Sequence, residues 1–232
     1  MRGAAALAAL EAARKPARYL PPGAIVYHQE EPDDVAFNLI SGWAMLTQSL
    51  PDGRRQVLRF LLPGAVFGPT PQGQALHGSA AEALTPAVLC VIPREGMTAL
   101  RRHWPEFDDR LMWCIERDAE LAAGLLTSIG QRTAIERVAY LLVELAMRAL
   151  RRFPLRNGDT VALPLTQTVI AEATGLTAVH VNRMLRELRQ RQVAIFLQRR
   201  LTVLDAAALL ALASLPPELP ALWTGTSPFS FA

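Results

Sequence analysis

Short apolar stretches separated by clusters of proline and glycine fill the chain between Tyr19 and Ile92. The stretches are strand-sized and closely spaced, which is typical of an all-β sandwich or roll. The clearest turn is Pro51-Asp52-Gly53, because Asp and Gly tolerate the positive φ angles that tight hairpins need. The predicted strands cover residues 24–27, 35–40, 43–50, 56–62 and 87–92.

A helical pattern replaces the strand pattern after about Arg94. Between residues 104 and 130 apolar residues recur at intervals of three and four, which predicts one long helix with an apolar seam suited to pairing with a second helix. Asp118 falls on this seam where an apolar residue is expected, and the alternative is a helix that packs only on its own β domain. A break at residues 131–133 precedes a second predicted helix, over residues 134–151. The seam consists of Leu111, Ile115, Ala122, Leu125 and Ile129.

The N-terminal segment is rich in alanine but does not have the pattern of a secretory signal. Glu11, Arg14 and Lys15 interrupt it, and no long apolar core follows. We therefore expect an exposed amphipathic helix, which makes residues 1–19 an N-terminal helical extension. Apolar runs elsewhere are shorter than the roughly 18 residues that a transmembrane helix needs, so no membrane partner is expected.

Two helices joined by a glycine turn are predicted in residues 163–204. Thr166 is suited to cap the first helix, and Gly175 fits the left-handed residue at its end. Thr177 then caps a second helix that runs to about Gln190. This order of helix, short turn and helix is typical of a DNA-binding helix-turn-helix.

The second of these helices has one apolar face and one polar face. Helical spacing turns Val181, Leu185 and Leu188 toward the core. A solvent-facing row with Asn and Arg is suited to the DNA major groove, because Arg bonds guanine and Asn bonds adenine through two hydrogen bonds each. The outward row consists of Ala178, Val179, Asn182, Arg183 and Arg186.

A short basic hairpin follows the two helices. Residues 193–197 and 200–204 are predicted strands joined by Gln198-Arg199-Arg200, which would lie beside the DNA backbone as a wing. The whole segment therefore predicts a winged helix. The alternative is a signalling module whose winged helix contacts protein, since an exposed arginine is often only a solvated charge.

Composition and charge agree with a folded, DNA-binding protein. The 232 residues are 51% hydrophobic and 19% charged, which excludes wholesale disorder and a disulfide-dense scaffold. The net charge is +3, and residues 164–204 contain six arginines against two glutamates. The positive charge is therefore concentrated in the segment that predicts DNA binding. No glycine-rich phosphate loop, zinc-binding pair or nucleophile elbow indicates an enzyme.

Three stretches of the sequence resemble the Crp-Fnr superfamily of bacterial transcription regulators. "LPLTQTVIAEATGLTAVHVNRMLRELRQRQVAIF" (163–196) resembles its DNA-binding signature, and "AIERVAYLLVELAMRAL" (134–150) resembles the helix before it. "DGRRQVLRFLLPGAVFG" (52–68) resembles its cyclic-nucleotide-binding-type β-roll. Several motifs in the right order make this resemblance specific.

The resemblance implies an α+β chain with a β-roll sensor domain, a long dimerisation helix and a winged helix-turn-helix domain. It implies a homodimer, paired along the long helix, that binds a palindromic operator in double-stranded DNA and acts with RNA polymerase in the cytoplasm. The implied segments are 20–103 for the β-roll, 104–130 for the dimerisation helix, 133–212 for the DNA-binding domain and 213–232 for a tail.

Within the recognition helix, Arg183 matches the arginine that contacts guanine in the family. Val179 stands where many members have a glutamate that accepts from cytosine, so we expect an apolar contact there instead. Asn182 stands where relatives have serine or glycine and would add adenine readout, whereas His180 is either a phosphate contact or idle. The other expected DNA-binding residues are Thr166, Gln167, Thr168, Arg186 and Arg199.

The sensor domain lacks the charged groups that bind cyclic AMP in relatives, namely a glutamate after Phe-Gly and an arginine before Ser-Ala. Here Pro69 follows Gly68, and Gly78 precedes Ser79, so these residues form a degenerate effector pocket. A buried phosphate without its arginine would lose a strong charge-assisted pair. His77 is adjacent and would substitute only in part. We therefore predict a regulator that is independent of cyclic AMP.

The sequence around Gly78 is closer to the Fnr and FixK side of the superfamily, which often carries an iron-sulfur cluster on four cysteines. This chain has only Cys90 and Cys114, so that cluster is excluded for one chain, and both thiols are expected to be buried packing residues. We predict no cofactor and no metal. A haem-dependent or other ligand-dependent sensor of the same fold remains an alternative, with conceivable axial ligands at His28, His77 and His103.

Overall fold

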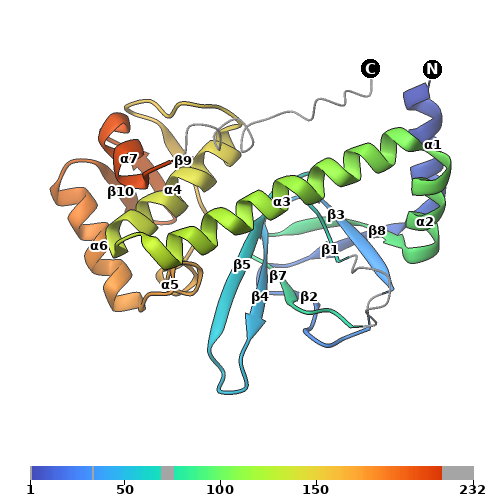
Figure 1. The fold of residues 1–232 in the computed structure, drawn as a ribbon, viewed down its shortest axis with the longest axis horizontal. Helices are drawn as coiled ribbons and strands as arrows, with labels where there is room; N and C mark the ends of the chain where they lie inside the picture. The colour runs from blue at the N-terminus through green and yellow to red at the C-terminus, as the bar shows by residue number, and fades with distance from the viewer. Residues whose placement is uncertain (1, 33, 69–75, 216–232) are drawn as a thin grey trace. The chain divides into compact units, whose positions relative to one another are not determined.

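The computed structural model describes residues 2–32, 34–68 and 76–215, which form two compact units (Figure 1). The first unit comprises residues up to Asp118 except Gln56–Leu58. The second comprises Gln56–Leu58 and the described residues from Ala119 to Leu215. The division falls within one continuous helix, α3 (Pro105–Gln131), so each unit includes part of it.

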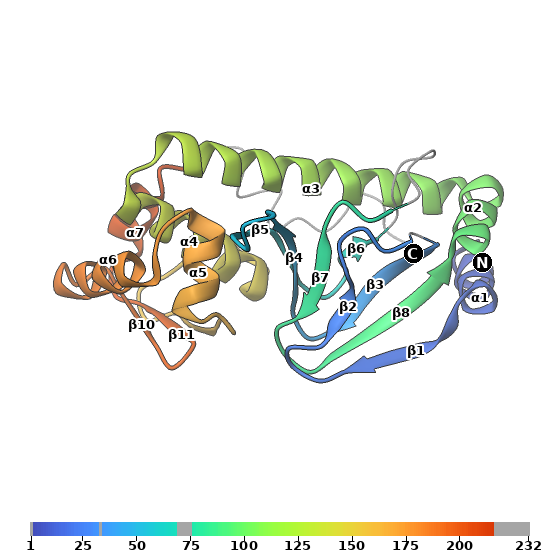
Figure 2. The same ribbon diagram turned by 90° about the horizontal axis from the view of Figure 1, so that it is seen from below.

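The first unit is a β-roll of two four-stranded sheets (Figure 2). The strand order is β1-β8-β3-β6 in one sheet and β2-β7-β4-β5 in the other. Buried residues from both sheets pack into one apolar core. The predicted α+β class with an N-terminal β-roll is confirmed. The strands are β1 (Lys15–Leu20), β2 (Ile25–Tyr27), β3 (Val35–Ser41), β4 (Ala44–Ser49), β5 (Arg55–Leu61), β6 (Val66–Phe67), β7 (Ala80–Ala83) and β8 (Ala87–Pro93).

The hairpin between β4 and β5 turns where the sequence predicts. The Arg54 carbonyl accepts a hydrogen bond from the Leu50 amide at 2.8 Å, and Gly53 has a φ of +85°. An L side chain rarely adopts that φ, so glycine is the residue that lets this turn close tightly.

Aromatic rings fill part of the β-roll core. Phe37 stacks on Phe67 with ring centroids 5.4 Å apart, and Tyr27 stacks on Phe37 at 5.8 Å. His77 lies against the ring of Tyr27 at 3.8 Å and is 3% exposed. The imidazole is therefore part of the packed interior, where it contributes aromatic contact area.

The N-terminal prediction is wrong in part. The helix α1 ends earlier than expected (Arg2–Ala13), and Lys15–Leu20 is a strand of the sheet, antiparallel to β8. The reason is tertiary pairing: β8 offers an open edge, and Arg18 donates from Nη1 to the Val26 carbonyl at 2.8 Å. These contacts hold the segment extended although its alanine-rich start favours helix.

A short helix that the sequence analysis did not predict, α2 (Arg94–His103), precedes α3. Trp104 separates the two helices, with φ −131° and ψ 87°. Proline disfavours helical backbone in the residue before it, so Pro105 ends α2 at this point and begins α3. The predicted break at residues 131–133 is confirmed, because α4 (Ala134–Leu150) begins directly after it.

Two residues of the predicted seam on α3 are covered by the chain itself. Leu111 is 5% exposed and packs in the core beside Cys90, and Leu125 is 7% exposed, so neither is available to a second chain. Asp118 faces its own unit and forms an ion pair with Arg59, which explains a charged residue at that position. Local periodicity could not show which apolar residues of α3 the chain itself would cover.

An exposed apolar row does run along α3 and shares two residues with the predicted seam. We call it the α3 stripe; Ile115 and Ala122 of the predicted seam belong to it, whereas Ile129, half-buried, lies beyond its end. Leu126 is 73% exposed, Ile115 48% and Met112 41%. The spacing alternates three and four, which is the heptad pattern of a paired helix. The α3 stripe consists of Met112, Ile115, Ala119, Ala122 and Leu126.

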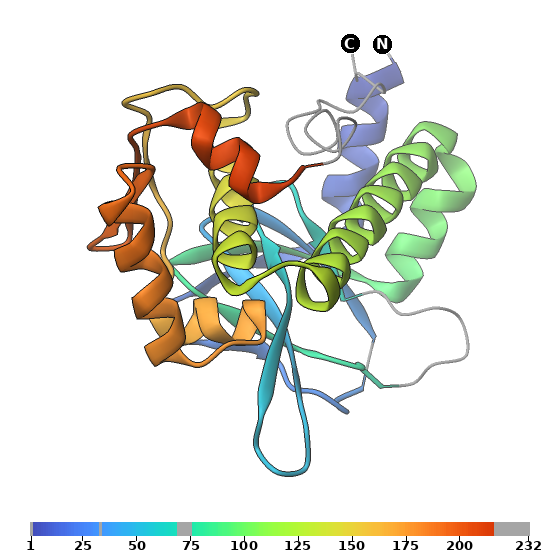
Figure 3. The same cartoon turned by 60° about the vertical axis from the view of Figure 1, so that its left-hand side comes forward.

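The second unit packs helices around α4, which is buried throughout its middle. Figure 3 shows α5, α6 and α7, in orange to red, around the yellow-green α4. The side chain of Thr133 and that of Glu136 cap each other's backbone at the start of α4. The other elements are β9 (Thr160–Ala162), α5 (Gln167–Thr174), α6 (Ala178–Gln190), β10 (Ala194–Leu197), β11 (Arg200–Val203) and α7 (Ala206–Ala213).

Arg132, between α3 and α4, contacts α4 and the end of α7. Its guanidinium lies 4.2 Å above the Tyr140 ring and donates to the carbonyls of Ala213 at 3.1 Å and Ser214 at 2.9 Å. Gly124 of α3 lies so close to Tyr140 that a Cβ there would approach the hydroxyl at 2.1 Å. Glycine at 124 is therefore required by packing rather than by backbone conformation.

Asp159 stabilises the loop before β9 in its charged form. It forms an ion pair with Arg152 and accepts a hydrogen bond from the Arg156 amide at 2.8 Å, and these partners lower the pKa of its carboxyl group. Because the pKa is lower in the folded state than in the unfolded state, the charged Asp159 stabilises the fold at pH values above the unfolded-state pKa. This stabilisation is lost as the pH falls through the folded-state pKa. We expect Asp159→Asn to lower the melting temperature at pH 7 by roughly 1–4 °C, and the difference to be smaller at pH 3, below the ordinary pKa of 3.8. Thermal unfolding followed by circular dichroism at both pH values measures this, and an equal deficit at pH 3 would contradict it.

No helix in the described ranges has both the length and the apolar character that crossing a bilayer requires.

Candidate nucleic-acid interface

The two helices of the helix-turn-helix begin and end where their capping residues predict. Thr166 Oγ1 accepts from the Val169 amide at the start of α5, and Thr177 Oγ1 accepts from the His180 amide at the start of α6, both at 3.2 Å. Gly175 ends α5 with a φ of +65°. Each of the two threonine hydroxyl oxygens accepts from a backbone N–H that the start of a helix would otherwise leave unpaired.

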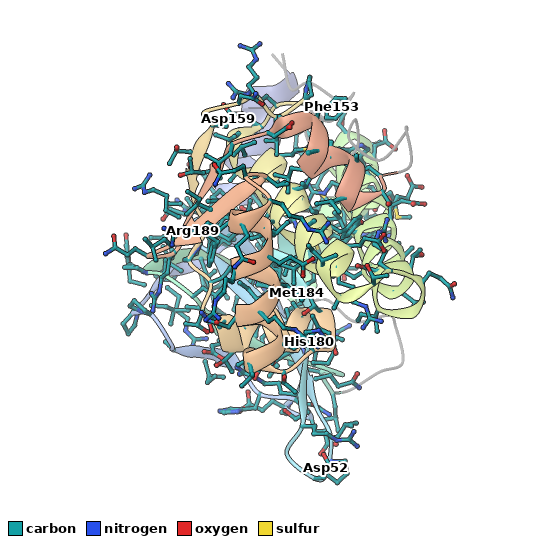
Figure 4. All side chains as sticks on the ribbon, turned by 90° about the vertical axis from the view of Figure 1, so that its left-hand side faces the viewer. Asp52, Phe153, Asp159, His180, Met184 and Arg189 are labelled. Atoms are coloured by element: carbon teal, nitrogen blue, oxygen red, sulfur yellow. The ribbon has the colours of Figure 1, made fainter. Side chains whose placement is uncertain are left out.

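The α6 helix divides into the two predicted faces. Met184 and the three predicted core residues are buried, whereas the other side is open to solvent. Figure 4 places His180 near the beginning of α6 and Arg189 near its end, with Met184 between them. The exposed residues on this helix include Val179, Asn182, Arg183, Arg186 and Arg189.

The polar side chains of the outward face are linked to one another in two groups. Arg183 donates from Nη2 to Nε2 of His180 at 2.8 Å. Asn182 donates from Nδ2 to Gln167 Oε1 of α5 at 3.3 Å, and its Oδ1 accepts from Arg186 at 3.5 Å. Adenine readout by Asn182 thus requires it to give up two long, weak contacts. The contact between Arg183 and His180 uses one N–H of the guanidinium and leaves the other four available to a ligand.

Val179 presents an apolar surface to solvent. Its side chain is 82% exposed, the largest value among the exposed large hydrophobic residues described. A valine neither donates nor accepts a hydrogen bond, so it can contact a thymine methyl group but cannot accept from cytosine N4.

The residues at the start of α5 form an exposed polar surface at the beginning of a helix. Thr166, Gln167 and Thr168 are all exposed, and unpaired amide groups at a helix start favour anions. The Thr166 hydroxyl oxygen accepts from the backbone but retains its own proton to donate. These three residues and α6 therefore belong to one surface, which the bond between Gln167 and Asn182 joins.

The basic hairpin forms the predicted wing, with a third strand that the sequence did not reveal. Leu197 pairs with Arg200, and the two turn residues Gln198 and Arg199 have φ values of 50° and 58°. Arg199 is exposed at this tip, and its carbonyl accepts from the Leu163 amide. The added strand, β9, pairs with β11. It has only three residues, which is too short for an alternation pattern to be recognised in the sequence.

Not every arginine of the basic segment serves this surface. Arg191 forms an ion pair with Glu187 one turn earlier on α6, so its charge is partly neutralised within the helix. Arg183 and Arg186 instead extend from the face that Asn182 shares. The exposed polar side chains Asn182, Arg183 and Arg186 thus lie together on one face of α6.

The degenerate effector pocket shows no charged side chain among its described residues. Gly68 has a φ of +93°, and a Cβ there would lie 2.9 Å from Phe37. Gly78 is exposed and Ser79 is half-buried, while Pro69 lies outside the described residues. Since His77 is packed against Tyr27, its ring is poorly placed to replace the missing phosphate-binding arginine.

Neither cysteine has the surroundings of a reactive thiol. Cys90 and Cys114 are both buried, and burial raises the pKa of each thiol above its ordinary value. Among the described residues no group of three or more His, Cys, Asp or Glu side chains is arranged to hold a metal ion. His28 and His103 are exposed, and the His103 ring nitrogen Nδ1 lies 2.9 Å from the Ala99 carbonyl of its own helix.

Two family profiles match the chain. The cyclic nucleotide-binding domain matches residues 17–103, and the Crp-like helix-turn-helix domain matches residues 136–212. The first match begins within β1, in agreement with the strand that the structure shows there.

Curated relatives and a solved structure agree with both profiles. The chain is 30% identical to the transcriptional activatory protein AadR of Rhodopseudomonas palustris, over 85% of this chain and 80% of the relative. It is 31% identical to the nitrogen fixation regulation protein FixK of Rhizobium meliloti, over 82% and 84% of the two chains. The structure of FixK2 from Bradyrhizobium japonicum superimposes with a TM-score of 0.75 at 25% identity, covering 88% of this chain and 98% of that one.

Proposed function

Since this chain belongs to the Crp-Fnr superfamily of bacterial transcription regulators, we propose that it acts as a homodimer on a two-fold symmetric operator, without cyclic AMP. It is a DNA-binding transcription regulator and not an enzyme. The observation that carries the proposal is the outward face of α6, where an exposed arginine, asparagine and valine share the first two turns. These are side chains that distinguish base pairs in the major groove.

The α3 stripe supports the homodimer. Leu126 and Ile115 expose large apolar side chains at heptad spacing, and a second copy of the helix would bury them. Two-fold pairing along α3 would present two copies of α6, and therefore two half-sites about one helical turn apart. The operator is then a palindrome whose symmetry matches that of the protein.

Direct base readout is assigned to Arg183 and Val179. Arg183 binds guanine O6 and N7, and Val179 contacts a thymine methyl group in the same half-site. Thr166, Gln167 and Thr168 contact phosphates from the start of α5, and Arg199 does so from the wing. Arg186 contacts phosphate or base beside Asn182.

Activation of transcription is the regulatory outcome that we propose, through a contact with RNA polymerase in the cytoplasm. The relative AadR is named a transcriptional activatory protein, and this chain aligns with 80% of it. The winged helix would recruit the polymerase to promoters that carry the operator.

Cyclic AMP is not expected to bind at physiological concentrations. The residues that replace the phosphate-binding arginine and the ribose-binding glutamate are uncharged, and His77 is buried against Tyr27. Removing a charge-assisted pair to a buried phosphate costs several kcal/mol, which is roughly a hundredfold or more in affinity. Isothermal titration calorimetry with cyclic AMP should give no heat of binding up to about 100 μM, and micromolar affinity would contradict this part of the proposal.

Salt dependence separates DNA binding from a role of the winged helix in protein contacts. If the two halves of a dimer together neutralise about six phosphates, the logarithm of the association constant falls with the logarithm of salt concentration with a slope of about −5. Fluorescence anisotropy with a labelled duplex measures this slope. A flat response would indicate that DNA is not the ligand of this surface.

A further inference from the structure

The imidazole of His180 lies beside the base-reading arginine. His180 and Arg183 are three residues apart on α6, so both side chains occupy the same face of the helix. Arg183 Nη2 and His180 Nε2 are 2.8 Å apart, the shortest of the three side-chain contacts on this face. The histidine is half-buried, whereas the arginine is exposed.

The chemistry of the two groups fixes the direction of this hydrogen bond. A guanidinium has five N–H donors and no acceptor, so the arginine must donate. Nε2 of His180 can accept only if the ring is neutral and carries its proton on Nδ1. One N–H of Arg183 is used in this way, and the remaining four are enough for two hydrogen bonds to guanine.

We propose that His180 is a positioning residue for DNA readout: its Nε2 accepts from Arg183 and holds the guanidinium in the orientation that guanine requires. This inference rests on the proposed function, because it assigns a role within the same recognition surface. It gives His180 a contact inside the protein in place of a contact to phosphate.

The expected gain in affinity for guanine arises because the Arg183 side chain is already ordered before DNA binds. A long arginine side chain loses rotamer freedom when it binds a base, and an existing hydrogen bond removes part of that cost. Immobilising one such side chain is worth about 2- to 10-fold in affinity per half-site. Because the orientation matters only where guanine is read, the gain should appear in discrimination between bases rather than in affinity for all DNA.

Two substitutions separate positioning from other roles. His180→Leu removes the acceptor, and His180→Gln keeps one, the side-chain carbonyl oxygen, at similar reach. Gln190→Leu makes the same apolar exchange at an exposed position at the end of α6 and is the matched control. Each variant is titrated by anisotropy against the selected operator, an operator with the guanine replaced in both half-sites, and a non-specific duplex.

Positioning predicts that His180→Leu reduces discrimination against the replaced guanine about 5- to 100-fold over two half-sites, with the slope against salt unchanged. His180→Gln restores most of it, Gln190→Leu leaves it intact, and His180→Leu adds nothing in an Arg183→Ala background. A phosphate contact would instead weaken binding to all three duplexes alike and reduce the salt slope by about one per half-site. That result, or unchanged discrimination, would overturn the inference.

The free protein provides a test that does not depend on DNA. Long-range proton–nitrogen NMR at pH 8 reports which ring nitrogen of His180 carries the proton. We expect the Nδ1–H tautomer in the wild type and a shift toward the Nε2–H tautomer in Arg183→Ala. A predominant Nε2–H tautomer in the wild type would overturn the inference, whereas a wild type that does not discriminate between duplexes would contradict the proposed function instead.

Discussion

Arg183→Ala is expected to abolish discrimination between the operator and unrelated DNA while leaving the fold intact. The side chain is exposed, and its contact is to His180 on the same surface rather than to the core. An arginine that binds one guanine through two hydrogen bonds contributes about 1–3 kcal/mol of discrimination, and a symmetric site uses it twice. The expected loss is therefore at least about 30-fold, measured as the ratio of dissociation constants for the selected operator and a scrambled duplex.

Arg189→Ala is the matched control for this prediction. It removes the same charge from an exposed position on α6, near the end opposite His180 (Figure 4). It should weaken binding to every duplex by a similar small factor and lower the salt slope without changing site preference. If Arg183→Ala kept the wild-type preference in a variant with an unchanged melting temperature, the assignment of the recognition helix would be wrong.

Leu126→Glu is expected to separate the two chains and thereby to weaken operator binding about 100-fold or more. Leu126 is the most exposed large residue of the α3 stripe, at 73%, and pairing would bury it. A charge there must be desolvated on association, which costs several kcal/mol without a partner. Two linked half-site contacts gain about 10²- to 10⁴-fold over either alone, and a monomer loses that gain.

Thr127→Glu is the control, since it adds the same charge to the next exposed position of α3, outside the stripe. Sedimentation velocity at micromolar concentration should show two chains for the wild type and for Thr127→Glu, and one chain for Leu126→Glu. Circular dichroism should report the same helix content for all three, because neither residue lies in a core. A dimeric Leu126→Glu with full operator affinity would show that the α3 stripe is not the dimer interface.

The winged helix could be predicted from sequence because its signals are local. Thr166, Gly175 and Thr177 each fix a helix end through contacts within a few residues. The buried and exposed faces of α6 follow directly from helical spacing. The pair formed by His180 and Arg183 could also have been suspected, because residues three apart on a helix are neighbours.

The exposed apolar stripe of α3 could be predicted only in outline, because its register depends on tertiary packing. Leu111 and Leu125 fit an apolar period as well as Met112 and Leu126 do, and the sequence does not say which set the chain itself covers. Asp118 was the available signal: a charge on the proposed seam marks the side that faces Arg59. A stripe with Met112, Ala119 and Leu126 in place of the residues before them keeps the spacing of three and four without that charge.

Elements defined by pairing rather than by pattern could not be predicted. The strand at Lys15–Leu20 exists because β8 offers an edge, and β9 exists because β11 does. The effector region is a different case, since the loss of its charged residues is visible in the sequence at Pro69 and Gly78. The structure adds that His77, the remaining candidate there, is packed in the core.

Selection of binding sites from a random pool of double-stranded DNA is the most direct test of the account. The purified protein is used in air with no added ligand, after sedimentation has established its oligomeric state. We expect enrichment of a palindrome whose half-sites lie about one helical turn apart, with a guanine whose selection requires Arg183 and a neighbouring thymine opposite Val179. Failure of a folded, dimeric protein to enrich any site would contradict an effector-free DNA-binding regulator.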